Sequence, residues 1–215
     1  MKSIWIIGAG HFGLRAVELL SGKDSKMDIT VIEKDKKICE QIEDMPFKVV
    51  CMDGVAYLDK NLKIQEYPDW IIPAIPVHLS YKWIRIKLQK ERRLVTIEVP
   101  HQLIMTLPNP FKGKDSEIYI SNADFICPEN CPEPDEICTY TGKPRPKSLY
   151  KALESIQYND FLSVVIQSRQ LLPGLGGYMP EALFEAFVEI TASRTPVLLS
   201  TACHCHGVMN AFKIS

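Results

Sequence analysis

The sequence predicts an α/β protein with a Rossmann-like open, mostly parallel sheet and a cysteine-bearing, proline-rich insertion. Three observations predict this class. Apolar strands alternate with short helices along residues 3–75, a glycine loop joins the first strand to the first helix, and prolines recur between 100 and 147. We expect a Rossmann domain over 1–98, a proline-rich linker and cysteine insertion over 99–147, and a C-terminal α/β segment over 148–215 whose strands could continue the same sheet.

The N-terminal elements follow from short apolar runs separated by turn residues. Because these runs are apolar throughout, they suit parallel strands that are covered on both faces. The predicted strands span 3–7, 28–33, 47–52 and 69–74, with helices over 11–21, over 35–43 and directly after Asp53-Gly54.

Further elements are predicted before, within and beyond the insertion. A helix around 78–92 has six basic residues in and directly after it, the last being Arg93. We interpret them as a solvated helix face, because the rest of the chain shows no matching basic bias; an anionic partner or a membrane surface is the alternative. The further predicted elements are a strand near 117–121, a helix over 149–157, a strand over 163–167, a helix from Pro180, a strand over 196–200 and a terminal helix near 206–213.

Composition excludes several classes of protein. The chain of 215 residues has 25 Lys+Arg and 26 Asp+Glu, a net charge of −1, which argues against a nucleic-acid-binding protein. No apolar run is long enough for a membrane span, and the apolar N-terminus is too short for a signal peptide. Seven cysteines, an odd number with five in two tight groups, suggest a cytoplasmic protein with metal or redox chemistry.

The loop Gly8-Ala9-Gly10-His11-Phe12-Gly13 fits the pattern G-x-G-x-x-G between a strand and a helix. The first glycine permits the tight turn, the second lets the backbone approach a pyrophosphate, and the third lets the helix pack on the strand. A helix N-terminus offers amides to phosphates. We therefore expect a dinucleotide site. Two alternatives stay open: glycines that only form a tight turn, or another nucleotide such as S-adenosylmethionine or an adenine mononucleotide.

An acidic residue after the glycine loop predicts a preference between NAD(H) and NADP(H). Glu33 lies twenty residues after Gly13, at the end of the second predicted strand. A carboxylate there accepts hydrogen bonds from ribose hydroxyls and repels a 2′-phosphate, which favours NAD(H) over NADP(H). Lys34 would partly offset that repulsion.

Three segments carry a family resemblance: Ile6–Gly13, Val31-Ile32-Glu33-Lys34-Asp35 and Met52-Asp53-Gly54. This stretch, about residues 3–75, resembles the TrkA-N family of NAD-binding domains, the ligand-binding modules of potassium-uptake regulators. The resemblance implies that Asp53, with Gly54 beside it, lies near the adenosine end of the nucleotide. It does not extend into the cysteine-rich half of the chain, so it does not imply a role at a potassium channel.

The cysteines of the C-terminal half suggest a metal site. Cys127, Cys131 and Cys138 have the spacing C-x3-C-x6-C, and Cys203 and Cys205 follow the last predicted strand. Three close thiols plus one distant thiol or imidazole provide four ligands for zinc or an iron–sulfur cluster, and we expect one or both of Cys203 and Cys205 to bind the metal. Surface thiols or a disulfide are the alternatives. We predict that the two remaining cysteines, Cys39 and Cys51, are small core residues.

The identity of the metal stays open. Thiolate-only ligation beside Cys-Pro pairs favours an iron–sulfur cluster, whereas His204 and His206 keep zinc in consideration. The segment 127–138 contains four acids and no Lys or Arg, and such negative charge lowers a reduction potential.

A second glycine run, Pro173-Gly174-Leu175-Gly176-Gly177-Tyr178, follows the strand over 163–167. Its amides could hold an anion with Arg169, or its glycines could only let a turn pass close to another segment. If one sheet is continuous, this loop, the cysteines and the nucleotide would face a single crevice.

The preferred hypothesis is an NAD(H)-binding redox protein that passes electrons between the nicotinamide and a cysteine-ligated metal centre, directly or through a redox partner protein. The runner-up is an NAD(H)-sensing regulatory module with structural zinc, and the third is a metal-dependent enzyme acting on a small anion. Self-association into a homo-oligomer stays an open alternative.

Overall fold

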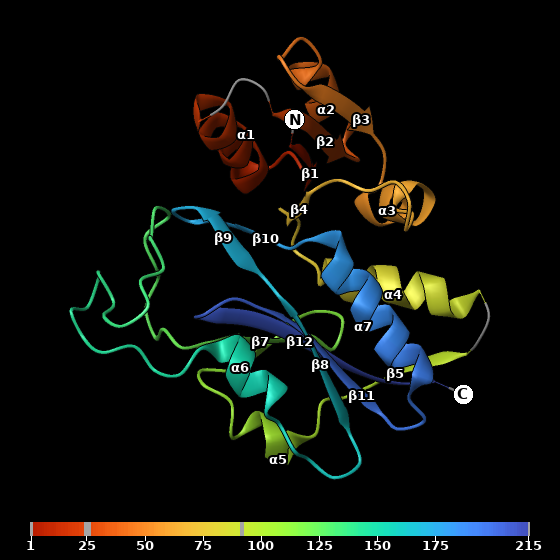
Figure 1. Ribbon diagram of the computed structural model, residues 1–215, viewed down its shortest axis with the longest axis vertical. Coiled ribbons are helices and arrows are strands. Elements are labelled where there is room, and N and C mark those ends of the chain that lie inside the picture. The colour runs from red at the N-terminus through yellow and green to blue at the C-terminus, as the bar shows by residue number, and fades with distance from the viewer. Residues whose placement is uncertain (1, 24–26, 91–92, 215) are drawn as a thin grey trace. The chain divides into compact units, whose positions relative to one another are not determined.

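The computed structural model describes residues 2–23, 27–90 and 93–214. These residues form two compact units, one containing residues 1–83 and 177–184 and the other residues 84–176 and 185–215. Figure 1 shows the chain coloured from red at the N-terminus to blue at the C-terminus. The last two residues of the predicted helix over 78–92 lie outside the described part of the chain.

The first unit contains a four-stranded parallel sheet with the order β3-β2-β1-β4. β1 pairs in parallel with both β2 and β4, and in Figure 1 these strands lie between α1 and α3. The predicted Rossmann-like parallel sheet is therefore confirmed. Its elements are β1 (Ser3–Ile7), α1 (His11–Lys23), β2 (Asp28–Glu33), α2 (Lys36–Ile42), β3 (Lys48–Cys51), α3 (Gly54–Asn61) and β4 (Trp70–Pro73).

Burial explains why these segments are strands. Every residue of β2 after Asp28 is buried, including Val31 and Ile32, because helices cover both faces of the sheet. The helices begin at carboxylate caps: Asp35 accepts the Lys37 amide at 2.9 Å, and Asp53 accepts the amides of Val55 and Ala56. The C-terminal edge of the sheet is thus defined by strand ends and capped helix starts.

The rest of the chain forms a second, mixed sheet with the order β6-β7-β12-β11-β8, in which β5 also pairs with β12, and a separate two-stranded sheet of β9 and β10. β8 and β11 are parallel, whereas β12 runs antiparallel to β11, β7 and β5. The remaining elements in chain order are α4 (Leu79–Gln89), β5 (Leu94–Ile97), α5 (His101–Ile104), β6 (Phe111–Lys112), β7 (Ile118–Ser121), α6 (Leu149–Glu154), β8 (Leu162–Gln167), β9 (Arg169–Leu172), β10 (Leu175–Gly177), α7 (Pro180–Ala192), β11 (Val197–Ala202) and β12 (His206–Ile214).

Two expectations for the C-terminal half are wrong. The predicted helix near 206–213 is the strand β12, whose four consecutive buried residues end in Ala211 and Phe212. A short apolar run does not distinguish a buried strand from a helix by periodicity. The strands of residues 148–215 also do not continue the first sheet: β8, β11 and β12 share a sheet with β5, β6 and β7, and β9 pairs with β10. The expected single crevice for nucleotide and cysteines depended on one continuous sheet, which the described residues do not form.

The cysteine-bearing segment lies against the end of this second sheet. Within residues 122–147, all described, the regular pairing is a single bridge between Ile137 and Pro144. Leu149 and Leu153 of α6 pack with Leu198 and Ala202 of β11 in the core of this unit. That core fixes the end of β11, and therefore the turn that carries Cys203 and Cys205.

None of the helices in the described part of the chain is long and apolar enough to cross a bilayer.

Candidate functional site

Two glycines of the first loop are required by packing inside the protein. Gly8 has φ +105°, and a Cβ there would lie 2.7 Å from the carbonyl oxygen of Ala74. A Cβ on Gly13 would lie 1.9 Å from the carbonyl oxygen of Gly8. The first and third glycines of the motif therefore close the turn and pack α1 against β1, as the motif predicts.

Gly10 is different, because packing does not require a glycine there. An added Cβ would meet no protein atom within 4 Å, and the Gly10 carbonyl accepts the Leu14 amide at 3.0 Å as α1 begins. His11 and Phe12 follow on the exposed first turn of α1. The motif predicts a glycine here so that a phosphate can approach the backbone, and that contact stays a prediction.

Glu33 lies at the end of β2, directly beside the glycine loop. Its Oε2 accepts the Ala9 amide at 2.7 Å, and its Oε1 accepts the amides of Lys34 and Asp35 at 2.7 and 2.9 Å. An ionised carboxylate has about four acceptor positions. Three amides therefore hold the carboxylate in place and leave Oε2 able to accept one further donor, such as a ribose hydroxyl.

The other predicted nucleotide residues have clear local roles. The Asp53 carboxylate caps α3, while a Cβ on Gly54 would lie 2.2 Å from the Ile7 side chain, so close packing explains that glycine. The side chain of Lys34 is exposed beyond the strand. Any contact of Asp53, Gly54 or Lys34 with a nucleotide stays a prediction.

In the second unit, backbone hydrogen bonds fix the cysteine loop. The Cys138 amide donates to the Lys143 carbonyl at 2.9 Å, and the Arg145 amide donates to the Glu136 carbonyl at 2.8 Å. These bonds form a narrow hairpin that places Arg145 opposite Glu136. Asn122 joins the loop to β11–β12, because its amide donates to the Cys205 carbonyl at 2.7 Å.

Four thiols and one guanidinium lie together at this loop. The thiols of Cys131, Cys205 and Cys138 are close enough to raise the pKa of Cys127, after burial, which is the main cause. Arg145 Nη2 donates to Cys205 Sγ at 2.7 Å. Burial raises the pKa of Cys205, and Arg145 opposes this rise. Hydrogen bonds at Thr141 lower the pKa of Cys138, and the charge of Arg145 adds to the effect. Arg145 was not predicted as a site residue, although it lies between Pro144 and Pro146 shortly after the acidic stretch 127–138.

Cys203 has other contacts than these four thiols. Burial raises its pKa to about 12, and its Sγ accepts the amides of Cys205 and His206 at 3.4 and 3.3 Å. Its charged neighbour is Glu133, whose Oε1 accepts the His204 amide at 2.8 Å and whose φ is +49°. Such a backbone conformation is uncommon for a non-glycine residue. Cys203 thus organises the turn, whereas Cys205 faces the other thiols.

The two histidines of this turn differ in surroundings. His206 Nε2 lies 3.6 Å from Cys127 Sγ, and burial lowers the pKa of His206. His204 Nδ1 lies 3.5 Å from Ser148 Oγ, while its Nε2 is buried without a hydrogen-bond partner. His206 is therefore the imidazole nearest the group of thiols.

The structure does not contain a ready-made metal site. Among the described residues, no group of three or more His, Cys, Asp or Glu side chains is placed so that it could hold a metal ion. All seven cysteines are free. The metal site stays a prediction, and its ligands would have to move closer together on binding.

The second glycine run supports the cysteine loop. Gly174 has φ +73°, and a Cβ there would lie 1.5 Å from the Glu129 carbonyl oxygen. Its amide donates to the Cys131 carbonyl at 2.9 Å, and Gln170 Nε2 donates to the same oxygen at 2.7 Å. The Gly174 amide thus has a protein acceptor, which favours the interpretation as a close-passing turn.

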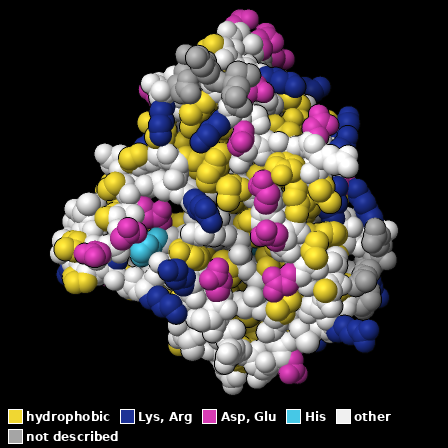
Figure 2. Space-filling model, viewed as in Figure 1, with side chains coloured by type: hydrophobic (Ala, Val, Ile, Leu, Met, Phe, Trp, Pro, Cys, Tyr) yellow, Lys and Arg dark blue, Asp and Glu magenta, His cyan; other side chains and the backbone are white. Residues whose placement is uncertain are grey.

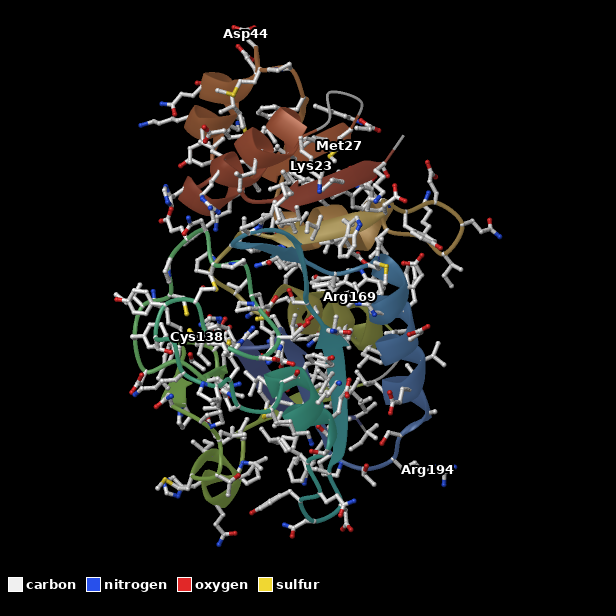
Figure 3. The ribbon with its side chains drawn as sticks, turned by 60° about the vertical axis from the view of Figure 1, so that its left-hand side comes forward. Lys23, Met27, Asp44, Cys138, Arg169 and Arg194 are labelled. Carbon is white, nitrogen blue, oxygen red and sulfur yellow. The ribbon has the colours of Figure 1, made fainter. Side chains whose placement is uncertain are left out.

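The other residues of the proposed anion loop each have different local contacts. Gly176 lies beside Ser168, and a Cβ on Gly177 would lie 2.7 Å from the Ile71 carbonyl oxygen. Arg169 is exposed and stands well apart from Cys138 (Figure 3). Its Nε donates to Gln167 at 3.3 Å. Anion binding by this loop stays a prediction.

One cysteine of the first unit is not where we expected it. Cys39 is buried in α2, as predicted for a core residue, but Cys51 is exposed. The reason is that β3 is an edge strand of the parallel sheet.

The fold and the glycine loop define a Rossmann-type nucleotide-binding unit joined to a second α/β unit. Residues 4–58 match the TrkA-N domain, which supports NAD(H) binding by this part of the chain. Residues 80–215 match the family AF_1314_C, described as "Uncharacterized protein, C-terminal domain", and the chain belongs to that family. An Archaeoglobus fulgidus protein described as "Uncharacterized protein" is 28% identical over 222 residues, covering 97% of this chain and 98% of the relative.

Proposed function

We propose that the protein is an NAD(H)-binding redox protein in which Cys127, Cys131, Cys138 and Cys205 hold a metal centre, with an iron–sulfur cluster favoured over zinc. The observation that carries the proposal is the placement of Arg145 among these four thiols, with Nη2 on Cys205 Sγ. A guanidinium stabilises thiolates, which are the form that binds metal.

The donor set fits a thiolate-bound cluster chemically. Four thiols match the ligand number of an iron–sulfur cluster, and Arg145 Nη1 is buried without a hydrogen-bond partner. The inorganic sulfide of a cluster would supply the missing acceptor, whereas a zinc ion brings none. Because residues 122–147 have little regular structure, the sulfurs can close on a metal without breaking a sheet or helix.

Electron counting sets the role of a partner. NADH gives up two electrons as a hydride, whereas an iron–sulfur cluster accepts one electron at a time. A flavin-containing redox partner would accept the hydride and pass the electrons singly, which balances the exchange. The four thiols would hold the cluster, Arg145 would offset its negative charge, and the glycine loop would hold the dinucleotide.

Acidic and apolar side chains are exposed on the cysteine loop, as expected of a docking region for such a partner. Glu129, Asp135 and Glu136 are exposed there, and so is Ile137. Figure 2 shows Asp and Glu side chains gathered with hydrophobic ones over this part of the face. We place the protein in the cytoplasm, because seven free cysteines suit a reducing compartment.

Anaerobic purification tests the metal part of the proposal. We expect iron and acid-labile sulfide, with a broad absorption near about 400 nm that bleaches with dithionite. Colourless protein with stoichiometric zinc would favour the sensor described below. Protein that contains no metal and takes up neither iron with sulfide nor zinc would contradict the proposed centre.

Calorimetric titration tests the nucleotide part. Wild-type protein should bind NADH more tightly than NADPH or S-adenosylmethionine. Glu33→Gln replaces a charged acceptor of the ribose hydroxyls with a neutral amide, so NADH should bind about tenfold more weakly, a loss of about 1.4 kcal/mol. The change also removes the charge that repels a 2′-phosphate, so the preference over NADPH should shrink. Asp44→Asn, an exposed charge change on the same unit (Figure 3), should leave both affinities unchanged. Tighter binding of NADPH than NADH by the wild type would refute the role of Glu33.

The second candidate is an NAD(H)-sensing regulatory module with structural zinc. The match of residues 4–58 to the TrkA-N domain favours it, as does His206 Nε2 beside Cys127 Sγ, because imidazole and thiolate together suit zinc. Zinc that survives dithionite without any spectral change would support this candidate.

A further inference from the structure

Two cysteines of the first unit converge on Glu33. Cys39 Sγ donates to the Glu33 carbonyl oxygen at 3.4 Å, and Cys51 pairs with Glu33 in the register of β2 and β3. The residue after Cys51, Met52, donates its amide to the same oxygen at 2.8 Å. The Cys51 thiol is close enough to contribute to the raised pKa of Cys39. Helix α2 and strand β3 therefore bring a thiol pair to the backbone of the predicted ribose-binding acid.

The pair is asymmetric in a way that suits thiol–disulfide exchange. Cys51 is exposed, so a small oxidant can reach its sulfur. Cys39 is buried, and burial, followed by the interaction with Cys51, raises the pKa of Cys39 to about 12. Since the thiolate is the attacking form, the exposed Cys51 reacts first and Cys39 reacts second.

We propose that Cys39 and Cys51 form a reversible disulfide that lowers the affinity of the first unit for NAD(H). Cys51 attacks a low-molecular-weight disulfide and releases one thiol, and Cys39 then attacks the mixed disulfide and releases the other. Two S–H bonds are replaced by one S–S bond, and the two electrons and two protons leave on the two small thiols.

The link to the nucleotide runs through Glu33. Oxidation removes the S–H donor to the Glu33 carbonyl and draws α2 toward β3. The Glu33 carboxylate, which holds the Ala9 amide of the glycine loop, follows its backbone. A shift of this residue weakens both the ribose contact and the loop geometry. The effect on affinity rests on the nucleotide-binding part of the proposed function, whereas formation of the disulfide does not.

The first test is chemical and needs no nucleotide. Full-length reduced protein is incubated with oxidised glutathione, remaining thiols are alkylated, and peptides are mapped by mass spectrometry. We expect a peptide linked through Cys39 and Cys51 that dithiothreitol releases. Cys39→Ala should instead accumulate glutathione on Cys51, and Cys51→Ser should leave Cys39 unmodified. Glutathione retained on Cys51 in the wild type, or unreacted Cys39 and Cys51 while other thiols react, would overturn the proposal.

The second test measures NADH affinity of oxidised and reduced protein. Oxidation should weaken binding by about fivefold or more, within the usual range of coupling between two sites. Cys51→Ser should show no such change, although its other thiols still oxidise. An equal loss in Cys51→Ser, or no loss in wild-type protein carrying the mapped disulfide, would overturn the effect on affinity. Failure of the reduced protein to bind NADH would instead count against the proposed function.

Discussion

The glycine loop and the cysteine loop achieve their geometry in opposite ways. The glycine loop is formed by regular elements: a buried strand precedes it, a helix begins within it, and Glu33 holds it through the Ala9 amide. The cysteine loop has almost no regular structure and depends on contacts with distant residues, such as Gly174 and Cys205. The first site is complete without a ligand, whereas we expect the second to become ordered around one.

Gly13→Ala should have the largest effect of the variants considered, a loss of NADH binding at the glycine loop. The added Cβ would lie 1.9 Å from the Gly8 carbonyl oxygen, so α1 must move away from the loop. Overpacking of this kind costs about 1–3 kcal/mol, which corresponds to a loss of NADH affinity on the order of a hundredfold at the upper end. Calorimetry measures the affinity, and circular dichroism checks that the protein is folded.

Gly22→Ala is the matched control for that variant. Gly22 lies in the same helix, and a Cβ there meets no protein atom within 4 Å. This change should raise stability by up to about 1 kcal/mol through helix propensity and leave NADH binding unchanged. Equal affinities of Gly13→Ala and the wild type would show that the loop is not the nucleotide site.

Gly174→Ala should affect the cysteine loop and leave the glycine loop unchanged. A Cβ there would collide with the Glu129 carbonyl in a left-handed backbone conformation and push the turn away from Cys131. Strain of this type costs about 1–3 kcal/mol. Metal content after reconstitution should become substoichiometric, while NADH affinity stays at the wild-type value. Arg169→Gln tests the alternative that this turn binds an anion, because the change should reduce phosphate binding only if the turn is an anion site.

Substitutions of Asp53 should have the smallest effect, and they test whether Asp53 contacts the nucleotide or only caps α3. Asp53→Ala removes the cap of α3 and should lower the free energy of unfolding by about 1 kcal/mol, measured by urea denaturation. Asp53→Asn keeps a capping side chain and should preserve stability. A loss of NADH affinity in Asp53→Asn would show a direct nucleotide contact, and an unchanged affinity would limit Asp53 to its capping role.

The sequence predicts the first unit well because its signals are local. The apolar runs around Ile6 and Val31, the glycine spacing and the caps each depend on neighbours within a few residues. The exposed position of Cys51 was missed because strand order, and hence which strand lies at an edge, is a tertiary property.

The second unit is predicted less well because its signals are long-range. β12 was expected to be a helix, since its burial comes from pairing with β11, β7 and β5 rather than from its own periodicity. The spacing of the cysteines gives their number but not the difference between Cys203 and Cys205. That difference depends on Glu133 and Arg145, which reach the turn from a distant loop.

Metal content of two serine variants tests the central claim most directly. Cys205→Ser and Cys203→Ser are purified anaerobically beside the wild type, and bound iron, sulfide and zinc are measured per chain. We predict that Cys205→Ser loses most of its metal, while Cys203→Ser keeps the wild-type content because its hydroxyl can still accept the amides of the turn. Retention of metal by Cys205→Ser together with its loss from Cys203→Ser would contradict the proposed ligand set.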